Sequence, residues 1–112
     1  MATKTFQIST YEIKLARQMT IGGGAIEFYS YIKCRGGGYT LLIYFLKPDS
    51  NDMDNIFLVD RKLGRIVVPW DQFPVYVDLL RNEKPLYAFL NSDKPILNRI
   101  YTGQEPVGEE ED

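Results

Sequence analysis

The stretch AIEFYSYIKCR, residues 25–35, alternates in side-chain character at every position and decides how the surrounding chain is interpreted. The alternation gives one set of residues, Ile26, Phe28, Ser30, Ile32 and Cys34, and a second set, Glu27, Tyr29, Tyr31, Lys33 and Arg35. A period of two residues predicts a β-strand whose first set packs on a core and whose second set points outward. Glycine triplets at residues 22–24 and 36–38 bracket the stretch. Because both triplets lie between predicted strands, we expect hairpin turns and not phosphate-binding loops.

Strand patterns continue on both sides of this stretch. Residues 11–21 alternate in the same way, and residues 39–47 are apolar on both faces, which is typical of a strand covered on both sides. With residues 25–35 these segments predict a three-stranded antiparallel meander. Residues 56–60 and 65–70 predict two more strands.

One helix is indicated, over about residues 71–83. Asp71 is a favourable N-cap, and Pro74 fits the first turn. An apolar stripe at helical spacing is formed by Phe73, Tyr76, Val77 and Leu80. Residues 86–90 and 96–102 predict a final strand pair. The expected fold is therefore α+β and mostly β, with a curved antiparallel sheet of about six or seven strands and the helix packed on one face.

Charge is distributed unevenly along the chain. The formal net charge is -2, but residues 1–104 carry 13 basic and 10 acidic side chains, a net of +3, and the other five acids lie in residues 105–112. We expect residues 1–104 to form a single β-rich domain. The acidic segment 105–112 has no apolar periodicity, so it is expected to be a disordered tail.

The residue types that are missing exclude several kinds of chemistry. The chain has no histidine and one cysteine, so it cannot supply a nucleophile–histidine pair, a histidine metal site or an intramolecular disulfide. Cys34 belongs to the inward set and is expected to be a buried thiol. The carboxylates Glu27, Asp60 and Asp71 show no spacing that brings two of them together. We therefore expect no catalytic residues, no metal and no cofactor.

The sequence also bears on location. Its first residues contain no apolar secretion signal, and its longest apolar run, residues 41–46, is too short to span a bilayer. These features favour a cytoplasmic protein without a membrane partner.

Two functions are compatible with this pattern, and the first is self-association or protein binding. One helix covers too little of a six- or seven-stranded sheet, and an uncovered aromatic face is a common subunit interface. Trp70, Phe73 and Tyr76 are the interface candidates, although the same residues also suit a core. This hypothesis predicts a homodimer or another homo-oligomer.

The second function is binding of single-stranded nucleic acid. Tyr29 and Tyr31 would stack on bases, and neighbouring cations would contact phosphates. The candidate cations are Lys33, Arg35, Arg61, Lys62 and Arg65. Alternatively, the two tyrosines pack against neighbouring strands. The cations at residues 61–62 would then belong to a turn that is only exposed to solvent.

A family resemblance points towards the second function. Residues 64–80, GRIVVPWDQFPVYVDLL, resemble the last strand and helix of small single-stranded-DNA-binding modules of the transcriptional coactivator p15 type and their Whirly and Pur-alpha relatives. In those families an alternating strand runs into a helix that starts with an acid, a glutamine and an aromatic residue, here DQF at residues 71–73. The resemblance covers roughly residues 25–83. It implies a dimer whose curved sheet carries single-stranded nucleic acid, with the tyrosines and cations of residues 29–35 on that sheet. The strand pair after the helix and the long first strand depart from the family pattern.

Overall fold

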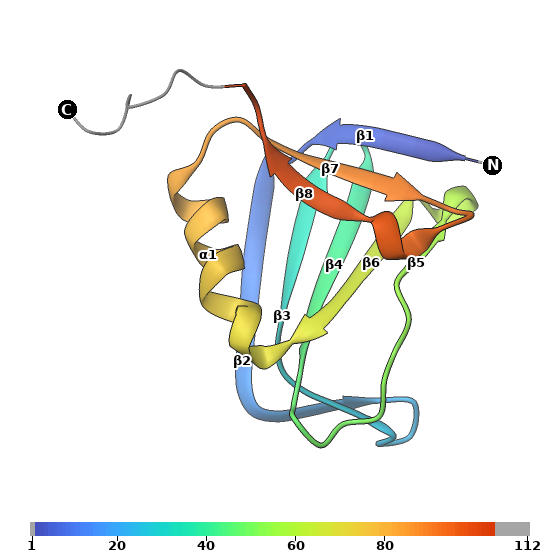
Figure 1. Cartoon of the computed structure of the whole chain (residues 1–112), viewed down its shortest axis with the longest axis vertical. Coiled ribbons are helices and arrows are strands. Elements are labelled where there is room, and N and C mark those ends of the chain that lie inside the picture. Colours follow the sequence, from blue (N-terminus) through green and yellow to red (C-terminus); the bar gives the residue numbers. More distant parts are fainter. Residues whose placement is uncertain (1, 105–112) are drawn as a thin grey trace.

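The computed structural model describes residues 2–104, which form eight strands, one α-helix and three short 3-10 turns (Figure 1). The strands are β1 (Thr3–Gln7), β2 (Thr10–Ile21), β3 (Ile26–Gly36), β4 (Tyr39–Leu46), β5 (Ile56–Leu58), β6 (Leu63–Pro69), β7 (Leu86–Asn91) and β8 (Arg99–Thr102). The helix is α1 (Phe73–Asn82), and the 3-10 turns are η1 (Val59–Arg61), η2 (Trp70–Gln72) and η3 (Pro95–Leu97). The fold is α+β and mostly β, as predicted. No helix within these residues is long and apolar enough to cross a membrane. The predicted acidic tail lies outside the described residues.

The strands form two sheets, so the prediction of one sheet of six or seven strands is wrong. The large sheet has the order β2-β3-β4-β6-β5, and the small sheet has the order β1-β7-β8. β2, β3 and β4 form the predicted antiparallel meander, and β6 pairs with β4 in parallel. The strand pair after the helix joins β1, which no sequence pattern predicts, and does not extend the large sheet.

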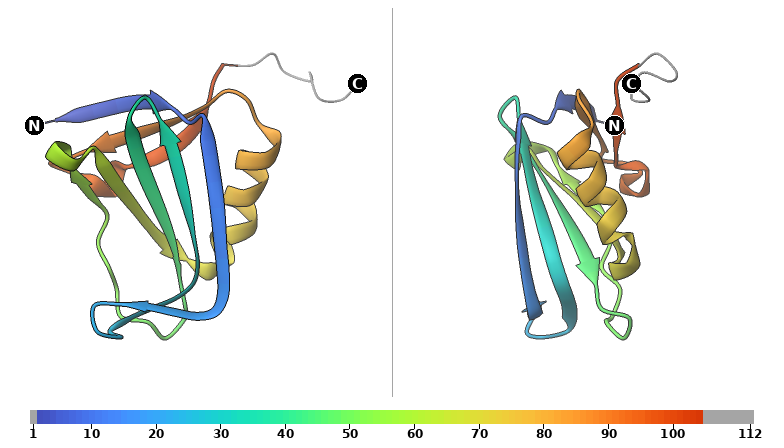
Figure 2. Two further views of the ribbon diagram at one scale, coloured as in Figure 1. Left: turned by 180° about the vertical axis from the view of Figure 1, so that it is seen from behind. Right: turned by 90° about the vertical axis from the view of Figure 1, so that its left-hand side faces the viewer.

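The lengths of the elements explain why a second sheet is needed. A ten-residue helix such as α1 is about 15 Å long, whereas an eleven-residue strand such as β3 reaches about 35 Å. The helix therefore covers only part of one face of the large sheet. Figure 2 shows that α1 and the small sheet lie on the same side of the large sheet. We call the covered side the inner face and the opposite side the outer face.

The hydrophobic core lies between the inner face and its two covers. Its buried members are Phe6, Ile32, Cys34, Leu41, Ile43, Phe45, Phe57, Ile66, Leu80, Leu86, Ala88 and Leu90. They come from both sheets and from α1, so one continuous core joins all three. Cys34 is completely buried, as predicted.

The side chain of Asn98 ties the two sheets together. Its Nδ2 group donates hydrogen bonds to the carbonyls of Ile56 (2.9 Å) and Arg65 (3.1 Å) on the large sheet. Its Oδ1 atom accepts a hydrogen bond of 2.8 Å from the backbone N–H of Asn91, the last residue of β7. Asn98 is only 6% exposed, so these bonds replace the hydration that the amide loses on burial.

The helix starts later than predicted, and Asp71 is not its N-cap. Residues 70–72 form η2, and Gln72 occupies the N-cap position with φ -84°, ψ -8° and no capping hydrogen bond from its side chain. A capping residue normally has an extended backbone, whereas here the chain has already turned. Pro74 lies in the first turn, as predicted.

Both glycine triplets lie at hairpins, as predicted. Gly37 and Gly38 have φ of +56° and +82°, a backbone conformation that other residues rarely adopt. Gly36 is buried at the end of β3, where a β-carbon would collide with the carbonyl of Gln7. The corner between β1 and β2 therefore packs directly on the β3–β4 hairpin.

A β-bulge at Tyr29 breaks the alternation of β3. Phe28 pairs with Leu46, and Ser30 pairs with Phe45, which leaves Tyr29 as an extra residue. Leu46 and Phe45 are consecutive and point to opposite faces, so Phe28 and Ser30 also point to opposite faces. The prediction that both belong to one face is wrong.

Candidate binding site on the outer face of the large sheet

An aromatic cluster occupies the middle of the outer face. Tyr31 of β3 pairs with Tyr44 of β4, and their ring centroids are 5.7 Å apart with the planes inclined at 36°. The ring of Phe28 meets Tyr44 edge-on at 5.0 Å and Tyr31 at 6.2 Å. Phe28 is 3% exposed, whereas both tyrosines are half-buried. The two tyrosine rings thus rest on a buried phenylalanine and keep part of their surface open.

Four cationic side chains lie on the same face as this cluster. They are Lys14, Lys33, Arg35 and Arg65, which the strand register places beside Tyr31, Leu42 and Thr40. Glu12 also lies on this face and forms an ion pair of 3.8 Å with Lys33. It is the one acidic strand residue on the outer face within residues 2–104. The face therefore carries net positive charge.

The aromatic cluster lies beside a hollow of about 420 Å³. Its lining residues are Met19, Thr20, Ile21, Phe28, Tyr31, Lys33, Leu42 and Tyr44. The register between β2 and β3 shifts between Leu15 and Met19, and this irregularity accompanies the bend of β2 near the hairpin tip seen from behind in Figure 2. Residues 19–21 thereby form one wall of the hollow.

Burial favours the protonated form of the Tyr44 hydroxyl. Burial is the main cause that raises the pKa of Tyr44 above its usual value, and the nearby Tyr31 raises it further, while the positive charge of Arg65 opposes the shift. The Nε atom of Arg65 donates a hydrogen bond of 2.8 Å to the Asp54 carbonyl, which anchors the guanidinium near Tyr44. The site therefore offers a neutral phenol, able to donate a hydrogen bond, beside a fixed cation.

Four of the residues predicted for nucleic-acid binding share this outer face: Tyr31, Lys33, Arg35 and Arg65. Tyr29 does not join them. Its ring lies 5.1 Å from that of Trp70 on the inner side, with the Lys47 ammonium 5.7 Å above it. The bulge is the physical reason, because it turns Tyr29 and Tyr31 to opposite faces.

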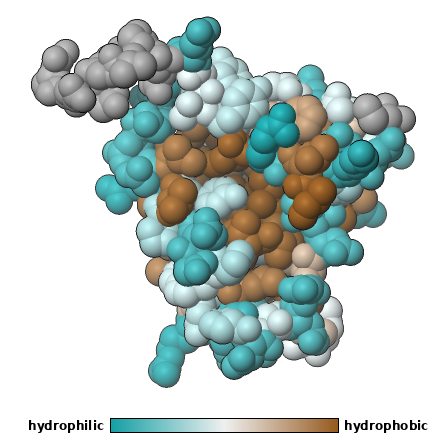
Figure 3. Space-filling view, viewed as in Figure 1, coloured by the Kyte–Doolittle hydropathy of each residue, from teal (hydrophilic) through white to brown (hydrophobic). Residues whose placement is uncertain are grey.

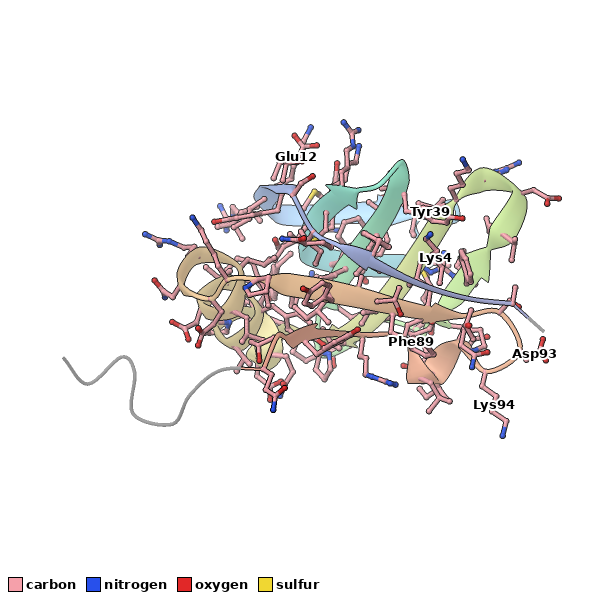
Figure 4. All side chains as sticks on the ribbon, turned by 90° about the horizontal axis from the view of Figure 1, so that it is seen from above. Lys4, Glu12, Tyr39, Phe89, Asp93 and Lys94 are labelled. Carbon is pink, nitrogen blue, oxygen red and sulfur yellow. The ribbon has the colours of Figure 1, made fainter. Side chains whose placement is uncertain are left out.

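Arg61 and Lys62 also lie away from the outer-face cluster, at the end of η1. The Lys62 ammonium is 5.7 Å from the ring of Tyr39, and the Lys4 ammonium is 5.0 Å from the same ring. Figure 4 shows Lys4 and Tyr39 side by side near β1. Tyr39 packs on Phe6 and Phe57 of the inner side, so these cations surround a different aromatic ring.

The three predicted interface residues form an aromatic layer between α1 and the large sheet. Trp70 stacks on Phe73 at 4.7 Å, and Phe73 and Tyr76 meet the ring of Phe45 edge-on at 5.1 and 5.5 Å. Burial raises the pKa of Tyr76. All three residues are half-buried, and Trp70 lines hollows on two sides of the helix start.

Tyr44, Lys14 and Phe28 belong to the outer-face site, but sequence reasoning missed them. Tyr44 lies in an apolar run that indicates burial on both faces. The hydroxyl of a tyrosine inside such a run is the one sequence feature that indicates a partly open face. The positions of Lys14 and Phe28 depend on register and on the bulge. Neither feature can be read from a two-residue period alone.

Two further surfaces of the molecule are open. Along β2, the inner-face side chains Tyr11, Ile13 and Leu15 are 37%, 37% and 62% exposed. Figure 3 shows a second apolar area between α1, β6 and β8. Partly buried residues from these elements include Val77, Val68 and Ile100.

The described residues offer little for covalent or metal chemistry. Within residues 2–104 no group of three or more Cys, Asp and Glu side chains is placed to hold a metal ion. Burial raises the pKa of the Cys34 thiol to about 12, so the nucleophilic thiolate is not populated at neutral pH.

Comparisons with known proteins give no family for this chain: no protein-family model, no curated protein and no solved structure matches it.

Proposed function

We propose that this chain is a non-catalytic binding module that takes single-stranded nucleic acid on the outer face of its large sheet. The observation that carries the proposal is the open Tyr31–Tyr44 pair, with ring centroids 5.7 Å apart, set among four cations. Base stacking on an aromatic side chain contributes about 1–3 kcal/mol per base, and lysine and arginine contact the phosphates between the bases. The resemblance of residues 64–80 to single-stranded-DNA-binding modules supports the same ligand.

The shape of the site favours single strands over duplexes. The tyrosine rings are half-buried beside a hollow, so a base must leave its own stack to lie against them. The bases of a single strand are free to do so, whereas those of a duplex are paired and stacked.

Fluorescence anisotropy with labelled oligothymidine tests this function. We expect binding at low salt that weakens steeply as salt is raised, because each neutralised phosphate releases counterions. Tyr44→Ala should lower the affinity, and Tyr101→Ala, at an exposed tyrosine of the small sheet, is the matched control. No binding at low salt, in a protein shown to be folded, would rule out the proposal.

Protein binding and self-association form a second candidate, favoured by the apolar surface between α1, β6 and β8 (Figure 3) and by the accessible part of Trp70. Trp70 is the single tryptophan of the chain, so its fluorescence reports on the start of the helix. A partner seated there should shift the tryptophan emission towards the blue. An emission spectrum that stays constant across the protein concentrations at which light scattering detects association would place the contact elsewhere.

A further inference from the structure

The large sheet ends at β2, whose outer edge is open within the described residues. β2 is a twelve-residue strand that pairs with β3 on one side, and within residues 2–104 no strand pairs with its other side. It contains no proline or glycine, and its first nine residues are all exposed. The irregularity of β2 lies beyond Leu15, so residues 10–15 keep a regular edge. The unpaired backbone groups of such an edge invite another strand.

Alternate residues of β2 direct their backbone groups to the free edge. The Lys14 carbonyl accepts a hydrogen bond of 2.7 Å from Ser30 Oγ and therefore faces β3. Backbone direction alternates along a strand, so Tyr11, Ile13 and Leu15 turn their N–H and C=O groups outward. These are the residues that would form hydrogen-bonded pairs with an added strand.

The side chains of β2 are complementary to a second, antiparallel copy of the same segment. We propose that β2 pairs with β2 of a second molecule about a two-fold axis at Ile13. In this register Ile13 lies opposite its own copy, and Tyr11 lies opposite Leu15 of the other chain. Glu12 lies opposite Lys14 of the other chain, so one apolar pair and one ion pair form on each side of the axis.

Neighbouring registers lack this complementarity. An axis at Glu12 or at Lys14 places two like charges opposite each other, Glu12 against Glu12 or Lys14 against Lys14. An axis at Leu15 places Ile13 opposite Arg17 and leaves Glu12 opposite Gln18. Of these registers, the Ile13 register alone matches Glu12 with Lys14 and Tyr11 with Leu15.

Apolar hollows lie at both ends of the exposed stripe and would receive the side chains of the second copy. Beside Tyr11 a hollow of about 610 Å³ is lined in part by Ile8, Leu80 and Leu86. Beside Leu15 a hollow of about 490 Å³ is lined in part by Tyr29 and Trp70. In the proposed dimer, Tyr11 of each molecule lies beside the hollow at Leu15 of the other molecule. Leu15 of each molecule lies beside the hollow at Tyr11 of the other molecule.

Charge reversal tests the register. Light scattering during size exclusion should detect a dimer of the wild-type chain that dissociates on dilution. Glu12→Lys alone and Lys14→Glu alone each create two like-charge pairs per dimer and should raise the dissociation constant about ten-fold. An equimolar mixture of the two variants restores opposite charges at both pairs, so it should form a heterodimer with near wild-type affinity. Asp93→Lys and Lys94→Glu, at an exposed turn far from Glu12 (Figure 4), are the matched controls.

Cysteine cross-linking tests the axis independently. Residues opposed in an antiparallel pair have Cα atoms about 4.5–5.5 Å apart, within the range of a disulfide. Ile13→Cys should therefore form an intermolecular disulfide under mild oxidation, whereas Lys14→Cys, which faces Glu12 of the other chain, should cross-link far less. The native Cys34 is buried and does not compete.

Several outcomes would overturn the dimer. These are a wild-type chain that stays monomeric at all concentrations, a dimer that the single charge reversals leave unchanged, and mixed variants that do not associate. A dimer that cross-links equally well through positions 13 and 14 would contradict the register. The readout is molecular mass without nucleic acid, so this proposal and the proposed function succeed or fail separately.

Discussion

Tyr29 and Tyr31 lie on opposite faces of the large sheet, although one residue separates them in β3. The bulge at Tyr29 directs the first ring to Trp70 and leaves the second ring beside Tyr44. One aromatic pair thus supports the start of the helix, and the other lines the open face. Both tyrosines are half-buried, but Tyr29 packs at the start of the helix and Tyr31 lines the outer face, so substitutions can test them separately.

Alanine substitution should separate these roles. Tyr31→Ala should weaken oligothymidine binding by about 1–3 kcal/mol with a small effect on stability. Tyr29→Ala should leave the affinity unchanged and lower the free energy of unfolding by about 1–2 kcal/mol, because it removes the contacts with Trp70 and Lys47. Anisotropy titrations and urea unfolding of both variants measure the two quantities. Equal losses of affinity would show that the two tyrosines act together.

Asn98→Ala should strongly destabilise the protein. The substitution removes three hydrogen bonds and leaves the Asn91 N–H and the Ile56 and Arg65 carbonyls without this partner. We expect a loss of about 3 kcal/mol in urea unfolding, since these groups are held between two sheets. Asn82→Ala, which removes an exposed side-chain hydrogen bond to Asp78, is the control and should cost less than about 0.5 kcal/mol. A loss for Asn98→Ala no larger than that of the control would contradict the role of Asn98 as a link between the sheets.

Ser30→Ala should cost about 1 kcal/mol of stability. Ser30 is completely buried, and its hydroxyl donates to the Lys14 carbonyl at 2.7 Å in a part-buried hydrogen bond, so the substitution removes a bond that water replaces only in part. The exposed Ser9 makes a comparable bond of 3.0 Å to the Arg35 carbonyl. Ser9→Ala should therefore have little effect, because water replaces the lost bond. Thermal unfolding of both variants gives the comparison, and equal shifts would contradict the dependence on burial.

The Cys34 thiol should make the protein less stable at alkaline pH. Its pKa rises from 9.0 to about 12 on folding because the thiolate is excluded from the core. Above pH 9 the unfolded chain loses this proton while the folded chain keeps it, so stability falls as the pH rises, with a slope approaching about 1.4 kcal/mol per pH unit. Cys34→Ala lacks this contribution. Urea unfolding of wild type and variant between pH 8 and pH 10 should show the steeper loss in the wild type, and parallel profiles would contradict it.

The sequence predicts those parts of the fold that depend on local periodicity. The meander of β2, β3 and β4, the helix and the burial of Cys34 all follow from periods of two or 3.6 residues. Lys33 and Arg35 lie on the predicted face for the same reason, whereas Arg65, expected at a neighbouring turn, joins this face through the register of β6 with β4. In these segments one face is clearly apolar, and burial then fixes the arrangement.

The remaining features depend on partners that are distant in the chain. β1 has five residues of mixed character and becomes a strand because β7 pairs with it. The bulge at Tyr29 arises from the register with β4, and it determines which tyrosines meet. Asn98 looks like an ordinary loop residue until the carbonyls of Ile56 and Arg65 are placed beside it. The order of residues along the chain does not by itself predict these long-range contacts.

The pairing of β1 with β7 has a consequence for the order in which the molecule can be completed. The Ala2 N–H donates to Ser92 Oγ at 3.0 Å across 90 residues of chain, so the small sheet joins two segments that are far apart in the sequence. Contacts of such wide separation form slowly, because a long loop must close before they bring any gain. During synthesis the meander and the helix can form as they emerge, but the inner face stays partly uncovered until β7 has left the ribosome. The newly made chain therefore exposes apolar residues of its inner face until β7 and β8 can pack on them.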